Sequence, residues 1–432
     1  MRPHKDSSAS VPDTLAASST PVFYGWWIVG ATMLSLIVGI GPIIGLTFGV
    51  FLKPLIEEFG WSRGQAAQGV SLALLGFALT QPLIGRLIGR YGAKRIILSS
   101  AFFFGLGLLC FSFLVAGLGS FYTCAITIGV MASGTSPLPY GTIIARWFVR
   151  RRGLALSLAL SGLGIGGIML PLLTSATIAA RGWRAAFVLL GALVLGIILP
   201  VVGLLVRETP EEMGLLPDGH APGDHGPAGP LSASAGCSLA EARNTTTFWA
   251  MALGFLLLTA AVQGCVVHLA PLLTDRGFSL TRAAAMVSLL SVGFLPGMLS
   301  SGYLVDRLSA PSVAAGFFSI AIAGFALLWQ ADSGHGVALA AVLLGVGMGA
   351  MVQLIPALVG WCFGLRAFSE IYGMLMATFG LGTVMGPLLV GWLFDMSGSY
   401  HLVPELCVVA TLLATGLIAS LRKHTAPSLD LT

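Results

Sequence analysis

The chain has 432 residues, of which 56% are hydrophobic and only 9% are charged. A soluble protein of this length needs a far more polar surface, so the composition excludes a soluble globular protein and indicates one that crosses a lipid bilayer many times. The formal net charge of +5 is modest, and the positions of the charges are more informative than their sum.

A helix that spans the hydrocarbon core of a bilayer needs about 20 mostly apolar residues. Runs of this kind lie at 24–51, 66–86, 96–117, 121–145, 153–179 and 184–206. After a polar break, further runs lie at 247–273, 283–304, 311–330, 336–362, 371–394 and 402–421. We therefore predict an all-α integral membrane protein with twelve transmembrane helices in two six-helix bundles, 24–206 and 247–421.

Three polar segments fall outside these spans. Residues 1–23 lack the charged-then-apolar order of a cleavable signal peptide, and residues 422–432 are also polar. Residues 207–246 are rich in Pro, Gly and acidic side chains and cannot bury enough apolar surface to order themselves fully. We predict two polar tails and a linker that joins the bundles.

The basic residues indicate the orientation. An even number of spans places both tails and the linker on one side, and that side holds 16 of the 22 Lys and Arg residues. Cytoplasmic loops carry such an excess, so both termini and the linker are predicted to be cytoplasmic. The basic stretch GRLIGRYGAKR at 85–95 then lies beside anionic lipid headgroups, which argues against a nucleic-acid site. Arg far exceeds Lys, and Ala and Gly are abundant, which favours a GC-rich bacterial genome and hence the inner membrane.

The sequence repeats itself at a shift of half its length. GRLIGR (85–90) aligns with GYLVDR (302–307), and GLGIGGIMLPLL (162–173) aligns with TFGLGTVMGPLL (378–389). FGWSRGQAA (59–67) aligns with RGFSLTRAA (276–284) at the same shift. The repeat predicts two halves related by a pseudo-two-fold axis along the membrane normal, as in two-bundle transporters.

Several of these stretches resemble known signatures. GRLIGRYGAKR is similar to the motif between the second and third spans of the major facilitator superfamily, and GYLVDRLSA (302–310) is a weaker second copy. YGWWIV (24–29), RGWRAAF (181–187) and ARWFVRRRGLALSLALSGLGIGG (145–167) resemble the monocarboxylate transporter branch. The resemblance implies the major facilitator fold and secondary transport by alternating access.

The same resemblance implies a conformational role for the basic loops. The loop at 85–95 is expected to contact cytoplasmic helix ends and to stabilise an outward-open state. Gly89 stands where the family pattern has an acid, whereas the second copy keeps Asp306. The residues expected to act in this gating are Arg86, Arg90, Arg95, Asp306, Arg307 and Glu370.

Motifs for an enzyme, a cofactor or a metal are missing from the sequence. GLGIGG (162–167) has a glycine spacing found in dinucleotide loops, but no strand precedes it and it lies inside an apolar span, where small residues allow close helix packing. The six cysteines form no CxxC pair and are interpreted as packing residues. We therefore expect neither catalysis nor a resident cofactor.

Ionisable and amide side chains inside spans are the candidate binding residues, because burying them is costly. His268, in the outer half of the seventh span, can exchange a proton near neutral pH and can donate a hydrogen bond to a carboxylate. The alternative is a packing role in which His268 bonds to a neighbouring helix. Four further polar groups lie deep in apolar spans and have the same two interpretations: Gln81, Tyr140, Gln263 and Gln353.

One departure from the monocarboxylate branch affects the expected substrate. In that branch the eighth span commonly carries an Asp and an Arg four residues apart, and Phe294 and Met298 stand at those positions. The usual cation for a carboxylate and the usual proton-linked acid are therefore both missing. This favours a larger, more apolar acid or a weakly charged substrate, and it makes His268 the leading candidate for substrate anchoring and proton coupling.

The function predicted from these observations is proton-coupled uptake of a small organic monocarboxylate by a monomer in the lipid bilayer. One alternative is efflux of a hydrophobic or amphipathic compound. A second alternative, from a different class, is a transporter-like receptor that binds its ligand without translocating it.

Overall fold

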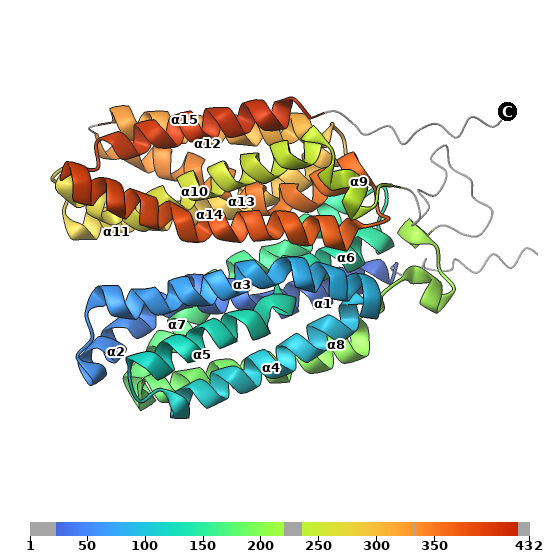
Figure 1. Ribbon diagram of the computed structural model, residues 1–432, viewed down its shortest axis with the longest axis horizontal. Coiled ribbons are helices and arrows are strands. Elements are labelled where there is room, and N and C mark those ends of the chain that lie inside the picture. The colour runs from blue at the N-terminus through green and yellow to red at the C-terminus, as the bar shows by residue number, and fades with distance from the viewer. Residues whose placement is uncertain (1–22, 220–235, 332, 422–432) are drawn as a thin grey trace, which may run out of the picture.

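The structure, a computed structural model, describes residues 23–219, 236–331 and 333–421, and this part of the chain is built from helices (Figure 1). The helices of the first half are α1 (Gly25–Ile37), α2 (Leu52–Phe59), α3 (Arg63–Tyr91), α4 (Ala93–Leu114), α5 (Leu118–Met131), α6 (Pro137–Trp147), α7 (Arg152–Leu193) and α8 (Leu199–Leu205). Those of the second half are α9 (Leu239–Arg243), α10 (Thr246–Asp275), α11 (Leu280–Val305), α12 (Ala310–Gln330), α13 (Gly334–Phe363), α14 (Phe368–Ser397) and α15 (Leu402–Ala419).

The predicted number of spans agrees with these helices. Within the described residues, eleven helical stretches are long and apolar enough to cross a membrane. One of them, residues 152–205, has 54 residues and contains two spans, because Gly182 adopts φ 80° and ψ 169°, outside helical geometry. Glycine accepts this positive φ without a steric penalty. The two parts of the stretch are the predicted fifth and sixth spans, which brings the total to twelve.

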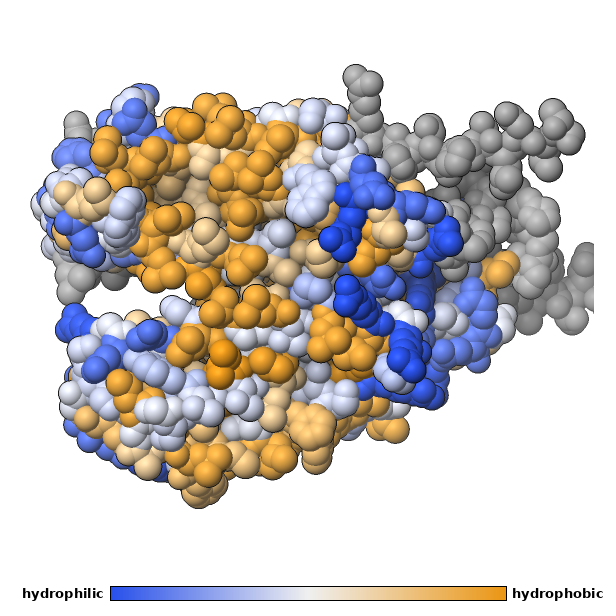
Figure 2. All heavy atoms as spheres, viewed as in Figure 1, coloured by the Kyte–Doolittle hydropathy of each residue, from blue (hydrophilic) through white to orange (hydrophobic). Residues whose placement is uncertain are grey.

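The two sets of helices form two halves that lie side by side, α1 to α8 in one and α9 to α15 in the other (Figure 1). We call the end of the molecule at α9 the linker end and the opposite end, at α2, the far end (Figure 1). The halves meet towards the linker end, whereas at the far end the space-filling view shows them separated by an open cleft (Figure 2). The flanks between the two ends are apolar, as expected for a surface that faces lipid.

The linker is bound to the first half where it begins. The Glu208 carboxylate accepts a hydrogen bond of 2.9 Å from the backbone N–H of Lys94 and lies 3.7 Å from the Arg146 guanidinium. Asp218 accepts hydrogen bonds of 3.1 and 2.8 Å from the backbone N–H groups of Val149 and Arg150. The acidic side chains of this segment therefore satisfy a backbone amide in the first turn of α4 and two in the turn between α6 and α7, which its composition did not reveal.

The linker is bound to the second half where it ends. The backbone N–H of Cys237 donates a hydrogen bond of 2.9 Å to the carbonyl of Phe363, and Gly236 pairs with Gly364. Ser238 then caps α9 in a capping box with Glu241. The described ends of the linker are thus parts of the two halves.

Two sequence motifs from distant positions meet at the linker end. Phe23, just before α1, packs against Trp147 and Phe148 at the end of α6, with ring centroids 5.8 and 5.6 Å apart. Trp26 packs against Phe148 at 5.0 Å, and the Trp147 indole N–H donates to the carbonyl of Arg207. The aromatic residues of YGWWIV and ARWF therefore fix the start of the linker against the ends of two spans.

Candidate functional site

The halves touch through two glycines where α7 meets α11. A Cβ atom on Gly153 would collide with the carbonyl oxygen of Gly302 and would come within 2.8 Å of the Asp306 carboxylate. A Cβ on Gly302 would collide with Ser157 and with the carbonyl of Gly153. The two backbones are therefore in direct contact, and each glycine is required by the other helix.

Asp306 closes this contact by capping a helix of the other half. Its carboxylate accepts hydrogen bonds of 2.6 Å from the N–H of Gly153 and 2.9 Å from the N–H of Leu154, the second and third residues of α7. These amides have no partner inside their own helix, and a carboxylate is favoured at a helix N-terminus. Gln353 of α13 adds a 3.4 Å hydrogen bond from its side-chain amide to the carbonyl of Gly153.

A second contact, between α3 and α14, repeats the first. A Cβ on Gly85 would collide with the carbonyl of Ser369, and a Cβ on Gly373 would lie 2.7 Å from the carbonyl of Gln81. The half-length repeat aligns these positions with the first contact, since Gly85 corresponds to Gly302, Ser369 to Gly153 and Gly373 to Ser157. We call the two contacts together the gate, defined by Gly85, Ser369 and Gly373 and by Gly302, Gly153 and Ser157.

The two contacts differ in the position of their acid. Gly89 occupies the place of Asp306 and has no side chain to cap α14, whose N-cap residue Ala367 makes no side-chain capping bond. Glu370 is in the first turn of α14, and its carboxylate oxygen is 3.6 Å from where a Cβ of Gly89 would be. The family pattern has an acid in the loop at 85–95. Here the negative charge at that place comes from Glu370 of α14, the helix that this loop contacts.

This geometry refines what an acid at position 89 would do. A side chain fits there, because the nearest atoms to its Cβ are the Glu370 carboxylate at 3.6 Å and the Ser369 hydroxyl at 3.8 Å. Gly89→Asp alone is expected to change gate stability less than about twofold, because two carboxylates would then share one site. The double variant Gly89→Asp with Glu370→Gln is expected to stabilise the closed gate roughly fivefold, by about 1 kcal/mol of capping.

The population of the closed gate can be measured by maleimide labelling of Ser369→Cys in a background without other cysteines. Ser369 is 7% exposed in the closed gate, so slower labelling means a more stable gate. Glu370→Gln alone is the matched control. Equal labelling of the double variant and this control would contradict the assignment of Glu370.

The predicted gating arginines lie around the gate at the surface. Arg86, Arg90 and Arg95 are exposed, and the Arg90 guanidinium lies 5.2 Å from the ring centre of Tyr91. Arg307 is also exposed and lies 4.0 Å over the ring of Tyr303. No ion pair joins these four arginines to an acid within the described residues, and Figure 2 shows the hydrophilic side chains gathered at this end.

His268 lies towards the far end and connects three elements of the second half. Its Nε2 is 3.1 Å from the carbonyl of Pro387 in α14, and its Nδ1 is 3.2 Å from the hydroxyl of Tyr400, just before α15. A carbonyl can only accept, so Nε2 carries a proton and Nδ1 accepts from Tyr400 in the neutral ring. When the ring gains a second proton, Nδ1 donates to the same hydroxyl, so both protonation states remain hydrogen-bonded.

A related cluster fixes the far end of the first half. Glu58 of α2 accepts hydrogen bonds of 2.6 Å from the Trp183 indole and 2.7 Å from the Arg184 guanidinium. The half-length repeat aligns Trp183 with Tyr400 and Glu58 with Asp275. Burial raises the pKa of Tyr400, and the nearby negative charge of Asp275 contributes to the same shift. RGWRAAF thus ties the loop at Gly182 to the first span, as Tyr400 ties the loop before α15 to the seventh.

The other predicted polar residues do not form one cluster. Gln81 of α3 is fully buried and bonds to the carbonyl of Ser133 at 3.3 Å and to the Ser136 hydroxyl at 3.4 Å, both within its own half. Tyr140 of α6 and Gln353 of α13 are also fully buried, and Gln263 of α10 is half-buried. Within the described residues, no hydrogen bond joins any two of the predicted binding residues.

Two buried polar atoms without a partner nevertheless belong to residues near the gate. The side-chain oxygen of Gln353 and the hydroxyl of Tyr372 in α14 have no hydrogen-bond partner in the described chain. Both residues have neighbours beside Gly141 of α6. A Cβ on Gly141 would lie 3.2 Å from the Tyr372 ring and 4.0 Å from the side chain of Pro356, which is one turn from Gln353. Unpaired buried polar atoms are costly, so each of these atoms would be stabilised by water or by a ligand.

Phe294 and Met298 lie on α11 facing different surroundings. Phe294 is half-buried and approaches Gly164 of α7 in the other half, 3.4 Å from its Cβ position. Met298 is fully buried, and its backbone N lies 3.0 Å from the Cβ position of Gly349 in α13. Phe294 therefore lies at the interface of the halves, whereas Met298 packs inside the second half.

Several residues of the site were missed by sequence reasoning. Gly153 and Ser157 were within a quoted motif but had no assigned role, and the half-length repeat could have found them because it aligns them with Ser369 and Gly373. Glu208, Asp218 and Tyr400 gave no sequence signal, because each acts on a partner far away in the chain. Among the described residues, no group of three His, Cys, Asp or Glu side chains could hold a metal ion.

Comparison with known proteins places this arrangement among transporters. A sequence model of the Major Facilitator Superfamily matches residues 15–361. The chain is 30% identical to monocarboxylate transporter 11 of Mus musculus over 390 residues, 87% of this chain and 83% of that protein. It is 25% identical to the uncharacterized MFS-type transporter YhjX of Escherichia coli, over 78% of this chain and 81% of that one.

The fold also matches a solved structure. The helices superimpose on FucP, the fucose:proton symporter of Escherichia coli, with a TM-score of 0.68 and 15% sequence identity, over 91% of this chain and 98% of that chain. A FucP structure described as being in the outward conformation matches equally well. This likeness concerns the arrangement of the twelve helices.

Proposed function

This chain belongs to the Major Facilitator Superfamily, a family of membrane transporters and not of enzymes, and we propose that it carries a small organic monocarboxylate by alternating access, coupled to a proton. The observation that carries the proposal is the gate. The halves meet through two contacts related by the half-length repeat, while the far end stands open. Rocking the halves would break these contacts and open the linker end instead.

We further propose that the linker end faces the cytoplasm of a bacterium and that the protein lies in the inner membrane. The excess of Lys and Arg on this side supports the orientation. The match to FucP in its outward conformation supports it as well, because a far end open to the outside corresponds to that state. Relatives named as transporters in Escherichia coli and Bacillus subtilis support the bacterial source.

The proposed substrate is a monocarboxylate with a sizeable apolar part. The name of the 30%-identical relative supports the carboxylate class. Phe294 lies at the interface of the halves where the monocarboxylate branch has an acid, so this wall of the path is apolar. The same feature supports a second candidate, efflux of a hydrophobic or amphipathic compound. The Tyr372 hydroxyl would become accessible when the gate opens and could donate a hydrogen bond to the carboxylate there.

Transport assays in proteoliposomes test this proposal directly. Labelled monocarboxylates of increasing chain length are offered with and without an inward proton gradient. Gradient-driven accumulation supports the symporter, and stronger accumulation of longer acids supports the apolar wall. Extrusion of amphipathic compounds without uptake of acids would replace the proposal by efflux. Binding of an acid without any flux would replace it by a receptor.

His268 is proposed to carry the coupled proton. His268→Ala is expected to lower gradient-driven uptake at least tenfold, to the rate without a gradient, while exchange of substrate between the two sides stays within about twofold. The reason is that the imidazole is hydrogen-bonded in both protonation states, so it can gain and lose a proton without moving. Initial uptake rates and counterflow exchange in the same vesicles give the two quantities.

Tyr400→Phe is the matched control for a purely structural role. It keeps the imidazole and its bond to Pro387 but removes the partner of Nδ1, so it loosens the connection of α10 to the segment before α15. If the histidine only ties helices together, both variants lose uptake and exchange in parallel. That parallel loss, or intact coupling in His268→Ala, would contradict the assignment.

A further inference from the structure

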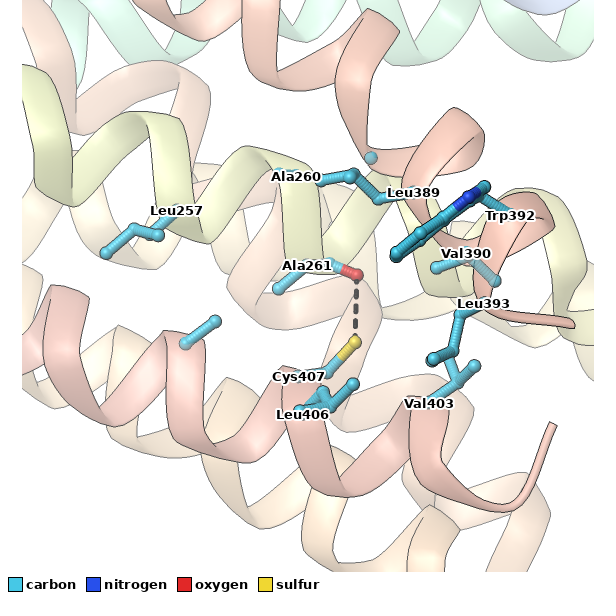
Figure 3. A pocket seen from close by; sticks show the side chains of 12 residues that line it. Leu257, Ala260, Ala261, Leu389, Val390, Trp392, Leu393, Val403, Leu406 and Cys407 are labelled. Carbon is cyan, nitrogen blue, oxygen red and sulfur yellow. Dashed lines mark hydrogen bonds between the residues drawn. The ribbon is translucent and has the colours of Figure 1, made fainter. Parts of the chain in front are cut away.

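An apolar groove lies in the second half, away from the gate, among α10, α14 and α15 (Figure 3). Its cavity volume is about 290 Å³, close to the lower limit of ligand pockets. Twelve residues line it, and none of them carries a charge. The groove is hollow because small residues form its floor: Ala260, Ala261, Gly386 and Ala410.

The hollow follows from how tightly α10 and α14 must pack. A Cβ on Gly386 would collide with the carbonyl of Ala260, so this position has to remain glycine. Where the two helices touch at Gly386, their side chains are too small to fill the space between α10, α14 and α15. That unfilled space is the groove. The side chains on its rim are strongly exposed: Leu389 is 51%, Trp392 61% and Leu406 52% exposed.

The surroundings of this groove are lipid, because all three helices are transmembrane spans. Trp392 is five residues before the end of α14 at the far end, about 8 Å along the helix axis, a depth at which indoles meet headgroups. Its indole N–H makes no hydrogen bond with any described residue. From this polar rim, the groove runs inward from Trp392 to Gly386, about 9 Å along α14.

The groove thus has a free N–H at the headgroup level and an apolar interior below it. This arrangement fits a molecule with a polar head and a long apolar tail. We propose that the groove binds one acyl chain of a phospholipid from the leaflet at the far end, with the Trp392 N–H donating to an ester carbonyl. The chain fills the floor of small residues and joins α15 to α10 and α14. No gate residue lines this site.

Photo-crosslinking identifies the occupant. The full-length protein is reconstituted in bilayers that contain a small fraction of phosphatidylcholine with a diazirine in one acyl chain, and the labelled residues are mapped by mass spectrometry. We expect labelling in 386–393 and 403–410 to exceed labelling around Trp329, which is 48% exposed on α12 outside the groove. Equal labelling of the two regions would overturn the proposal, because it would mean bulk lipid contact alone.

Two variants separate binding in the groove from contact with its rim. Ala410→Phe places a ring into the cavity and is expected to lower groove labelling at least fivefold, whereas Leu413→Phe, on the exposed side of the same helix, is expected to leave it unchanged. If Ala410→Phe fails to fold, Trp392→Leu on the exposed rim replaces it, with a loss of about threefold expected from the missing donor. Unchanged labelling in the folded variant would overturn the proposal. Labelling of the groove by a diazirine fatty acid but not by the diazirine phospholipid would also overturn the proposal, because the occupant would then be a free fatty acid.

Discussion

Gly153→Val is expected to lower the initial rate of substrate uptake at least tenfold. The Cβ of any larger residue would collide with the carbonyl of Gly302 and lie 2.8 Å from the Asp306 carboxylate, so α7 and α11 cannot approach. Overpacking of this kind costs about 1–3 kcal/mol, which shifts a two-state equilibrium roughly 5- to 150-fold away from the closed gate. Uptake in proteoliposomes and maleimide labelling of Ser369→Cys measure the two consequences.

The control for this variant is Gly316→Val. Gly316 is in the middle of α12, and a Cβ there would meet nothing within 4 Å, so the same change of residue leaves the helices in place. Its uptake and labelling should match those of the unmodified protein. If Gly153→Val keeps normal uptake while Ser369→Cys stays protected, the contact of α7 with α11 is not a gate.

Asp306→Ala is expected to open the gate by roughly thirtyfold, which corresponds to about 2 kcal/mol for leaving buried amides without an acceptor. The amides are those of Gly153 and Leu154, which have no acceptor within α7. Labelling of Ser369→Cys from the linker side should accelerate by that factor, since the two contacts of the gate break together. Asp218→Ala is a suitable control, because it also removes an acid that accepts two amides, but both amides belong to the first half. It also removes a negative charge near Asp306, so an effect of charge alone would be seen in both variants.

Asp306 also gives the gate a pH dependence whose sign follows from its pKa. Burial raises the pKa of Asp306, against the opposing hydrogen bonds from Leu154 and Gly153. With the gate open, the carboxyl is in water and titrates near its ordinary value of about 4. Between the pKa of Asp306 in the open gate and its higher pKa in the closed gate, the closed state binds more protons. The closed gate should therefore become more stable as pH falls through this range. Asp306→Asn keeps an acceptor without a charge, so its gate should not respond to pH. Because maleimide reacts with the thiolate, whose fraction changes with pH in both proteins, the quantity to compare is the ratio of their labelling rates at each pH. A ratio that stays constant across the window would contradict this origin.

The positions of the spans could be predicted because lipid imposes a length and a composition on every helix that crosses it. The predicted fold class, twelve helices in a major facilitator arrangement, is confirmed, and the span ends differ from the observed helices by a few residues. The half-length repeat aligned Gly85 with Gly302, and both glycines lie where the halves touch. The half-length repeat indicated where the halves touch because the chain forms the same kind of contact twice, once with each half of the repeat.

The partners of the candidate residues could not be predicted. His268 and Tyr400 are 132 positions apart, and nothing in either local sequence indicates the other. At Gly89 the sequence showed only that an acid is missing, and it could not show that Glu370 brings its carboxylate to the same place. The roles of Glu208 and Asp218 were also hidden, because a segment with the composition of a linker gives no sign that its acids accept hydrogen bonds from backbone amides of the first half.

The small residues of the gate have a consequence for the energetics of the transport cycle. Glycine has no side-chain conformational entropy to lose, and serine has little, so closing these contacts immobilises hardly any rotamers. Long charged side chains at the same positions would be ordered on closing and released on opening, which would make one state entropically dominant. Contacts between bare backbones let the open and closed forms differ by only a small free energy. A ligand that prefers one form by a few kcal/mol is then enough to decide which form prevails.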